Sequence, residues 1–332
     1  MSWTVNPVLN RELTERMRGP RAMIMLSIYL GVLGAIILLV YRATVSDNSN
    51  GFGSSPVTQL AGVGQSLFEW TLLLVLLLVL FLVPGFTAGS VAGERERQTL
   101  LPMQVTLLRP IDIVLGKIGA SVMFTLLLVV ATLPLLTVSY LIGGIRLVEI
   151  FQGLAIVLFT ALVVAALSVA CSTFMKRVQT ATVVSYALVL LLLAGTGILY
   201  AMAWQIDASR GADPADPPGW ILAANPVVAL ADLSGDDPLD RQLQNDFGFG
   251  NGSNSFAPLS ELRRGLSPDP FFDGRNDIAF DQFGNPIGDA AVLRNERAVP
   301  LWILFVGVSF FFTFDAVVGS VRRLRAPAEL ER

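Results

Sequence analysis

The chain has 332 residues, of which 53% are hydrophobic and 15% are charged, and its formal net charge is −3. A soluble domain carries about 25% charged residues, and here apolar residues form runs of about 20, enough to cross about 30 Å of hydrocarbon as a helix. Histidine is absent and Cys171 is the single cysteine, which excludes an intrachain disulfide and argues against histidine-based metal or proton chemistry. An all-α polytopic membrane protein is expected.

Residues 1–21 precede the apolar runs and predict a short amphipathic helix. Leu9, Leu13 and Met17 recur at i, i+4 and i+8, and charged residues occupy the other faces. Such a helix lies along the inner leaflet, with the following arginines at headgroup level near anionic lipid. The segment is therefore interpreted as a cytoplasmic interfacial helix, the alternative being a solvated tail.

Six segments are long and apolar enough to span a bilayer, and only a helix pairs every backbone group within such a segment. The first is longer than the apolar part of a signal peptide and lacks a persuasive cleavage site, so it is expected to be retained. The expected spans are Ala22–Tyr41, Leu67–Ala88, Ile118–Ile142, Ile150–Met175, Ala181–Ala203 and Val299–Val321.

Basic residues in the loops set the predicted orientation. With the N-terminus inside, 14 of the 23 Lys and Arg residues fall on cytoplasmic segments, whereas the two short outer loops hold only Arg42 and Arg146. Both termini are therefore expected in the cytoplasm, with residues 322–332 as a C-terminal tail after the sixth span at 299–321.

Two acidic residues lie within or beside the predicted spans, where a charge is a functional hypothesis by default. Glu69 stands beside Trp70 at the outer end of the second span, which favours solvation at the interface. Asp315 lies in the sixth span, seven residues before Arg322 and about 10 Å from it along the helix axis. Both acids are candidates for an interhelical polar contact or for lining a pathway.

The stretch at about 88–117, between the second and third spans, predicts a cytoplasmic helix–turn–helix. A mixed-charge cluster is followed by a semi-apolar run, and a second helix is expected to begin at Pro110. So many apolar residues predict a docking ridge, with charges to fix its register on a partner; the alternative is that the charges only keep a loop in water. The candidate contact residues are Glu94, Arg95, Glu96, Arg97, Thr99, Leu100 and Met103.

The segment 204–298 is the large region expected outside the membrane, on the extracytoplasmic side. It holds 15 acidic and 7 basic residues, and parts of it are rich in Pro, Gly and Asp. Apolar islands at Trp220–Leu233 and Phe271–Phe283 favour a small ordered cap, whereas the overall composition is equally typical of a partly disordered linker.

The stretch after the second span resembles a pattern in the permeases of type-2 ATP-binding-cassette (ABC) exporters. It departs from that pattern at Gln98, where glycine is usual, and at Leu107–Pro110, where a Thr-Pro-Leu-Ser-Arg turn is usual. Asn6–Glu12 (N-P-x-x-x-(R/K)-E), the link Ser172–Ala181 and Asn225–Leu230 (N-P-x-x-A-L) agree with the same family. The matching positions are Ala92, Gly93, Glu94, Arg95, Glu96, Thr99, Leu100, Ile113, Leu115, Gly116 and Lys117.

This resemblance implies the type-2 ABC exporter permease fold in a bacterial inner membrane, with Glu94–Met103 as the coupling helix that contacts an ATPase. It implies two ATPase subunits and a second copy of this chain as partners, besides membrane lipids, and no nucleic acid. It also implies that ATP and Mg are held by the ATPase, with no catalytic, cofactor or metal site in this chain. In keeping with this, the sequence contains no G-x-x-x-x-G-K-(S/T) phosphate-binding loop.

Three functions stay open at this point. The first is a permease that alternates access when its partner hydrolyses ATP, exporting a lipid, drug, peptide or other amphiphile, because the spans are almost wholly apolar. The second is an ABC-type maturation or assembly permease that transmits force to a periplasmic partner through the loop 204–298. The third is an ion-driven secondary transporter, for which one Asp315 and no histidine is thin support.

Overall fold

Helices account for the regular structure of this chain, because a helix pairs every backbone group within its own segment. The computed structural model describes residues 7–17, 20–48, 56–98, 109–209, 219–233, 257–265 and 301–325, and it has no strand in these ranges. In chain order the helices are α1 (Pro7–Met17), α2 (Pro20–Asn48), α3 (Pro56–Thr87), α4 (Ala92–Glu96), α6 (Pro110–Ile142), α7 (Leu147–Phe174), α8 (Val178–Leu190), the π-helix η1 (Leu191–Gly195), α9 (Thr196–Ser209), the 3₁₀-helix η2 (Gly219–Ala224), α10 (Pro226–Leu233), α12 (Pro258–Gly265) and α13 (Leu301–Arg325).

Six stretches of the described chain are long and apolar enough to cross a membrane, and they coincide in order with the six predicted spans. The second begins well before the predicted Leu67, because the early part of α3 has a packing role. Val63 and Ser66 are buried there, and a Cβ on Gly64 would collide with the carbonyl oxygen of Gly143 in the α6–α7 turn. Polar residues interrupt the apolar run in this segment, so a prediction based on apolar runs did not include it.

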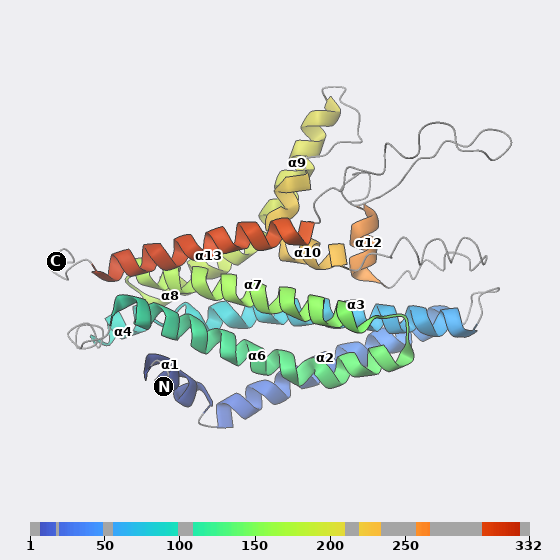
Figure 1. Cartoon of the computed structure of the whole chain (residues 1–332), viewed down its shortest axis with the longest axis horizontal. Coiled ribbons are helices and arrows are strands. Elements are labelled where there is room, and N and C mark those ends of the chain that lie inside the picture. Colours follow the sequence, from blue (N-terminus) through green and yellow to red (C-terminus); the bar gives the residue numbers. More distant parts are fainter. Residues whose placement is uncertain are drawn as a thin grey trace.

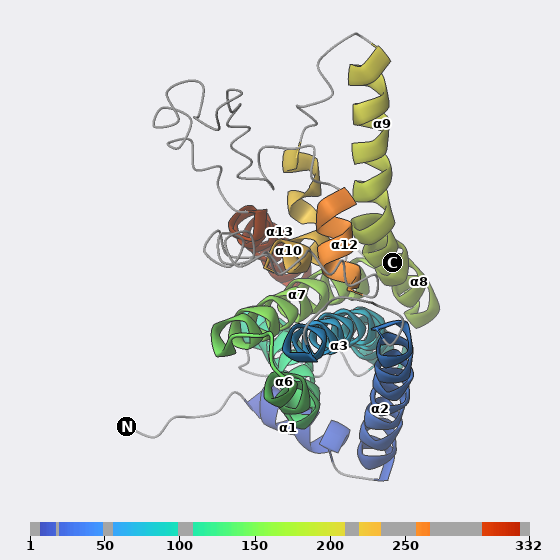
Figure 2. The same ribbon diagram turned by 90° about the vertical axis from the view of Figure 1, so that its right-hand side faces the viewer.

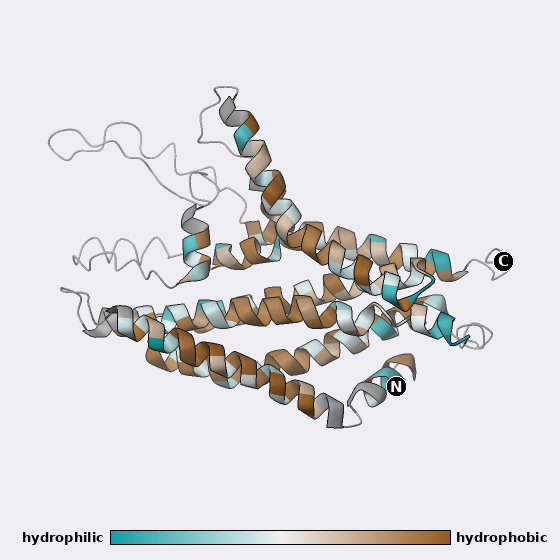
Figure 3. Cartoon of the chain, turned by 180° about the vertical axis from the view of Figure 1, so that it is seen from behind, coloured by the Kyte–Doolittle hydropathy of each residue, from teal (hydrophilic) through white to brown (hydrophobic). Residues whose placement is uncertain are grey.

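The core of the bundle is formed by α3, α6 and α7, which lie against one another in the view along the bundle (Figure 2). Between 39% and 67% of the most apolar window of each of these spans is buried, against 11% to 22% for the spans built from α2, α8–α9 and α13. The second set therefore leaves broad apolar faces uncovered, as expected for helices that meet lipid or another chain. Hydrophobic residues run along the whole length of the bundle (Figure 3).

The fifth span is interrupted by the π-helix η1, after which α9 leaves the direction of α8 and rises away from the bundle (Figure 1). α9 continues to Ser209, past the predicted end of the span at Ala203. The chain then returns through η2 and α10, which pack against α13 and α7. The apolar island Trp220–Leu233 thus corresponds to an ordered segment, whereas the island Phe271–Phe283 lies outside the described residues.

Asn225 connects the π-helix to this returning segment. Its Nδ2 donates to the carbonyl oxygen of Leu193 at 3.0 Å and to the hydroxyl of Thr196 at 2.9 Å. Its Oδ1 accepts a hydrogen bond from the backbone N–H of Val227, at 3.0 Å, in the first turn of α10. A π-helical turn disturbs the regular pairing of backbone carbonyls, so a buried amide donor at this point stabilises the irregular geometry.

Substituting Asn225 with alanine is expected to change the angle between α8 and α9. The Leu193 carbonyl would lose the Asn225 donor and keep only the Thr196 hydroxyl at 3.2 Å, at a cost of about 1 kcal/mol, which favours return to regular helix or a new kink. Spin labels on the exposed residues Val183 and Met202 report the angle as a distance distribution. Asn225→Asp keeps the acceptor for Val227 but cannot donate to Leu193, so it should also shift the distribution; an unchanged distribution in both variants contradicts this role.

Candidate functional site at the α4 end

Hydrophilic residues gather at the end of the bundle that carries α1, α4 and the last turns of α13 (Figures 1 and 3). This end was predicted to be cytoplasmic, and the candidate docking charges of residues 94–97 lie here. The helices that meet at this end come from distant parts of the sequence. What connects them is a set of polar contacts around one buried lysine.

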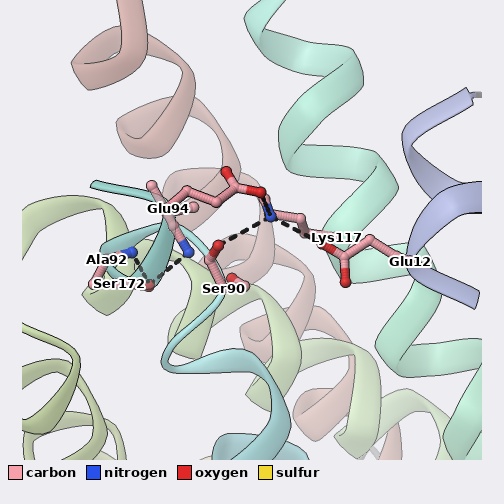
Figure 4. Close-up of polar contacts among 7 residues, drawn as sticks. Glu12, Ser90, Ala92, Glu94, Lys117 and Ser172 are labelled. Atoms are coloured by element: carbon pink, nitrogen blue, oxygen red, sulfur yellow. Dashed lines mark hydrogen bonds and ion pairs between the residues drawn. The ribbon is translucent and has the colours of Figure 1, made fainter. Parts of the chain in front are cut away.

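Lys117 is the centre of this site. Its side chain is 1% exposed, and its Nζ donates to Glu94 Oε1 at 2.8 Å, to Glu12 Oε1 at 2.9 Å and to the carbonyl oxygen of Ser90 at 3.0 Å (Figure 4). All three ammonium protons thus have acceptors. Because these acceptors lie on α1, on the turn after α3 and on α4, one cation in α6 holds three separate segments together.

The close approach of α1 to α6 depends on Gly116, the residue before this lysine. A Cβ at Gly116 would come within 2.9 Å of both Cβ and Cγ1 of Val8. Val8 is 7% exposed and is the most buried described side chain of α1, while Leu9 and Leu13 are partly buried. The helix predicted from Leu9, Leu13 and Met17 is present, and the side chain of Met17 lies outside the described part.

Ser172, near the end of α7, satisfies the first amides of α4. Its hydroxyl oxygen accepts hydrogen bonds from the backbone N–H groups of Val91 at 3.0 Å and Ala92 at 2.9 Å, and its side chain is fully buried (Figure 4). The residue before α4 makes no side-chain cap of its own. A serine from another helix therefore takes the place of a local N-cap and fixes where α4 begins.

Two charged residues of α4 bind the turn between α7 and α8. The guanidinium of Arg95 donates to the carbonyl oxygens of Thr173 (3.3 Å) and Met175 (3.0 Å), at the C-terminal end of α7 where the helix dipole favours a cation. Glu96 Oε1 accepts from the backbone N–H of Val178 (2.9 Å), at the N-terminus of α8 where the dipole favours an anion. Residues 91–98 and 175–178 thus form one unit, here named the α4 tip.

The outward-facing residues of the α4 tip are mainly basic. Arg97 and Gln98 are exposed after α4, and Lys176 and Arg177 are exposed in the α7–α8 turn. Gln98 has a φ of 57°, the left-handed conformation that favours glycine, which accounts for glycine being usual at this position in the resembling pattern. The helix α4 itself is five residues long and ends at Glu96, well before Met103.

The structure places the seven candidate contact residues in three groups. Glu94, Arg95 and Glu96 have partners within this chain, so they build the α4 tip rather than stand free on a ridge. Arg97 is exposed, and Thr99, Leu100 and Met103 lie outside the described residues. The expected second helix does begin at Pro110, as the first residue of α6.

No sequence pattern indicated a role for Lys117, Glu12 or Ser172. The composition offered a signal for Lys117, which is one of only two lysines among 23 basic residues. It also lies at the start of an apolar run and has no acidic residue beside it in the sequence. Glu12 and Ser172 stand in two of the three other segments that resemble the exporter pattern. Ser172 contacts residues 91–92 directly, and Glu12 is joined to Glu94 through Lys117, so these separate motifs meet at one place.

The prediction that Glu69 is solvated at the interface is wrong, because its side chain is fully buried. Glu69 Oε2 accepts from the backbone N–H groups of Leu259 (3.0 Å) and Ser260 (3.1 Å), and Oε1 accepts from Gln65 Nε2 (3.3 Å). A carboxylate of α3 therefore caps the N-terminus of α12. The partner lies 190 residues away in sequence, inside the long loop, so no local pattern indicated it.

Asp315 does not join either of these polar clusters. Its side chain is exposed on α13, and no ion pair joins it to Arg322 or to another described residue. Within the described ranges, no three Cys, Asp or Glu side chains gather as a metal ion would require.

Comparison with known proteins points to a transport family. A family model described as "ABC-2 family transporter protein" matches residues 42–236, which is more than half of the chain. The matched part runs from the end of α2 to just past α10, so it contains Lys117, Glu94, Ser172 and Asn225. No curated protein matches the chain.

Proposed function

The chain belongs to the ABC-2 family of transporter proteins, which are membrane permease components of ABC transporters, and we propose that it couples ATP hydrolysis on a separate subunit to export of an amphiphile. In this proposal two copies of the chain pair in a bacterial inner membrane, and two ATPase subunits bind at the α4 end. ATP and Mg belong to those subunits.

The observation that carries this proposal is the polar network of the α4 tip. Displacing α4 stretches hydrogen bonds to α1 and α6 through Lys117, to α7 through Ser172 and Arg95, and to α8 through Glu96. A push on the α4 tip is therefore passed to four helices at once. A solvated loop that merely joins two spans has no need of such connections.

The charges of the α4 tip indicate what its partner offers. Among its exposed charged residues, Arg97, Lys176 and Arg177 are basic, and the one exposed acid, Glu96, is engaged in capping α8. The sequence between 99 and 108 holds no charged residue, so it does not offset this balance. An acidic docking groove on the ATPase subunit fits these groups, with the apolar run 99–108 contributing packing.

Reversing two of these charges, Arg97→Glu together with Lys176→Glu, is expected to reduce recovery of the ATPase subunit on the affinity-purified permease at least about tenfold. Neither side chain makes a structural contact described above, so folding should be retained. The control is Arg42→Glu, an exposed arginine of α2 at the other end of the bundle.

The outcomes separate the alternatives. The double variant could keep the ATPase subunit but bind more weakly to vesicles containing anionic lipid. That result would assign these charges to the membrane surface and contradict the docking surface. Absence of any ATPase subunit from the wild-type complex, with transport that collapses when the proton gradient is dissipated, would refute the proposed function in favour of an ion-driven carrier.

One observation favours the assembly-permease alternative, in which force passes to a periplasmic partner. The buried carboxylate of Glu69 joins α3 to α12, a helix of the long loop, so movement of the bundle is passed to that loop. The two versions differ in what the outer loop binds. ATP-dependent accumulation of an amphiphile inside inverted vesicles containing only the permease and its ATPase supports export, whereas a requirement for a further periplasmic protein supports assembly.

A further inference from the structure

One carboxylate faces outward from a membrane-spanning helix. Asp315 is exposed on α13, nine residues before Leu324 and therefore about 14 Å along the axis from the end of that candidate span. It shares a helix face with Phe311, one turn earlier, and this face continues towards Gly307, where a Cβ would meet nothing within 4 Å. The surface is open in the single chain.

Hydrocarbon does not solvate an aspartate at this depth, and its side chain is too short to reach the headgroups as lysine or arginine does. No described basic residue pairs with Asp315, and Arg322 lies two turns further along α13. The face that carries Asp315 must therefore meet water or a polar group during the working cycle. A covering of lipid tails alone leaves the charge without a partner.

Exposed aromatic rings flank this carboxylate on α13. Phe311 (67% exposed) and Phe312 (43% exposed) lie about one turn before Asp315, at i−4 and i−3, with their ring centroids 6.3 Å apart, and the adjacent Phe314 is 62% exposed. A carboxylate supplies a counter-charge, and the faces of phenylalanine rings attract cations that carry apolar substituents. Together they form a surface suited to a cation that is soluble in the membrane.

We propose that Asp315 with Phe311, Phe312 and Phe314 binds a lipophilic cation, so that the exported amphiphile is positively charged. This inference rests on the proposed function and specifies its substrate class. A second copy of the chain is a poorer occupant, because two-fold pairing through this face brings two aspartates together without a cation between them. An anionic amphiphile is excluded by the same charge.

Two ions of the same shape and opposite charge test the site directly. The complete complex in nanodiscs of zwitterionic lipid is expected to bind tetraphenylphosphonium saturably in equilibrium dialysis and to bind tetraphenylborate no better than empty nanodiscs do. Asp315→Asn should weaken tetraphenylphosphonium binding at least about tenfold, and Asp315→Glu should restore most of it. Glu261→Gln, which removes an exposed acid of α12, is the control for general electrostatic attraction and should bind as the wild type does.

Equal binding of the cation by the wild type and Asp315→Asn, or equal binding of both ions by the wild type, would overturn the proposal. So would loss of cross-linking between two tagged copies in Asp315→Asn, because the aspartate would then belong to a subunit contact. Recovery of the ATPase subunit is measured on the same samples. A complex that keeps this subunit but shows no cation selectivity refutes the site alone, whereas a wild-type chain without the subunit refutes the proposed function.

Discussion

Replacing Lys117 with methionine is expected to lower stability by about 3 kcal/mol and to detach the α4 tip from α1 and α6. The substitution removes one buried cation and leaves the Glu12 and Glu94 carboxylates and the Ser90 carbonyl without their shared donor. Those carboxylates are 18% and 19% exposed, so water makes up only part of the loss. The expected readouts are a lower unfolding temperature in detergent and reduced recovery of the ATPase subunit.

The chain offers a matched control, because its only other lysine, Lys176, is exposed. Lys176→Met should leave the unfolding temperature unchanged. Glu94→Gln combined with Lys117→Met should cost less than the two single changes together, since residues of one network are not additive. An unfolding temperature equal to that of the wild type for Lys117→Met would show that the buried lysine does not hold this end together.

Replacing Glu69 with alanine is expected to release α12 from α3. The change removes the acceptor of the Leu259 and Ser260 amides, and hydrogen bonds to a carboxylate contribute about 1.5–3 kcal/mol each. Even about 2 kcal/mol of lost docking energy speeds amide exchange in residues 257–265 roughly thirtyfold. Hydrogen exchange followed by mass spectrometry of peptides from this segment measures the effect.

Glu69→Gln is the companion variant, since it keeps the size of the side chain and one acceptor oxygen while removing the charge. Its effect on exchange in 257–265 should be well below that of the alanine variant. Exchange in α4 serves as the internal reference and should not change in either variant. If residues 257–265 exchange at the wild-type rate in Glu69→Ala, the carboxylate is not what holds α12.

The Lys117 network and the Glu69 contact lie on different parts of the bundle but share a chemical design. At the α4 end a buried cation gathers carboxylates and a carbonyl, and on α3 a buried carboxylate gathers two amides. In each case a charged group of a core helix, α6 or α3, holds a short helix outside the spans. Hydrogen bonds to a charged group are strong where water is excluded. A short helix held by them can move together with the core helix to which it is bonded.

The spans were predictable from sequence because crossing a membrane is decided by the local length of an apolar run, whatever it packs against. The start of α6 at Pro110 was equally local, because proline is favoured in a first helical turn. The N-terminal part of α3 escaped prediction, since its helix is held by packing of Val63 and Ser66 rather than by continuous apolarity.

What only the tertiary structure decided is which polar groups meet. Lys117 and Glu12 are 105 residues apart, Glu69 and Leu259 are 190 apart, and Asn225 and Leu193 are 32 apart. Their partnership depends on how whole helices dock, and a charge pattern such as residues 94–97 cannot tell an outward contact from an internal one. The sequence by itself determined six apolar helices, because hydrophobic length is a local property. The contacts that join α4 to four other helices emerged only from long-range packing, where each buried charge requires its own partner.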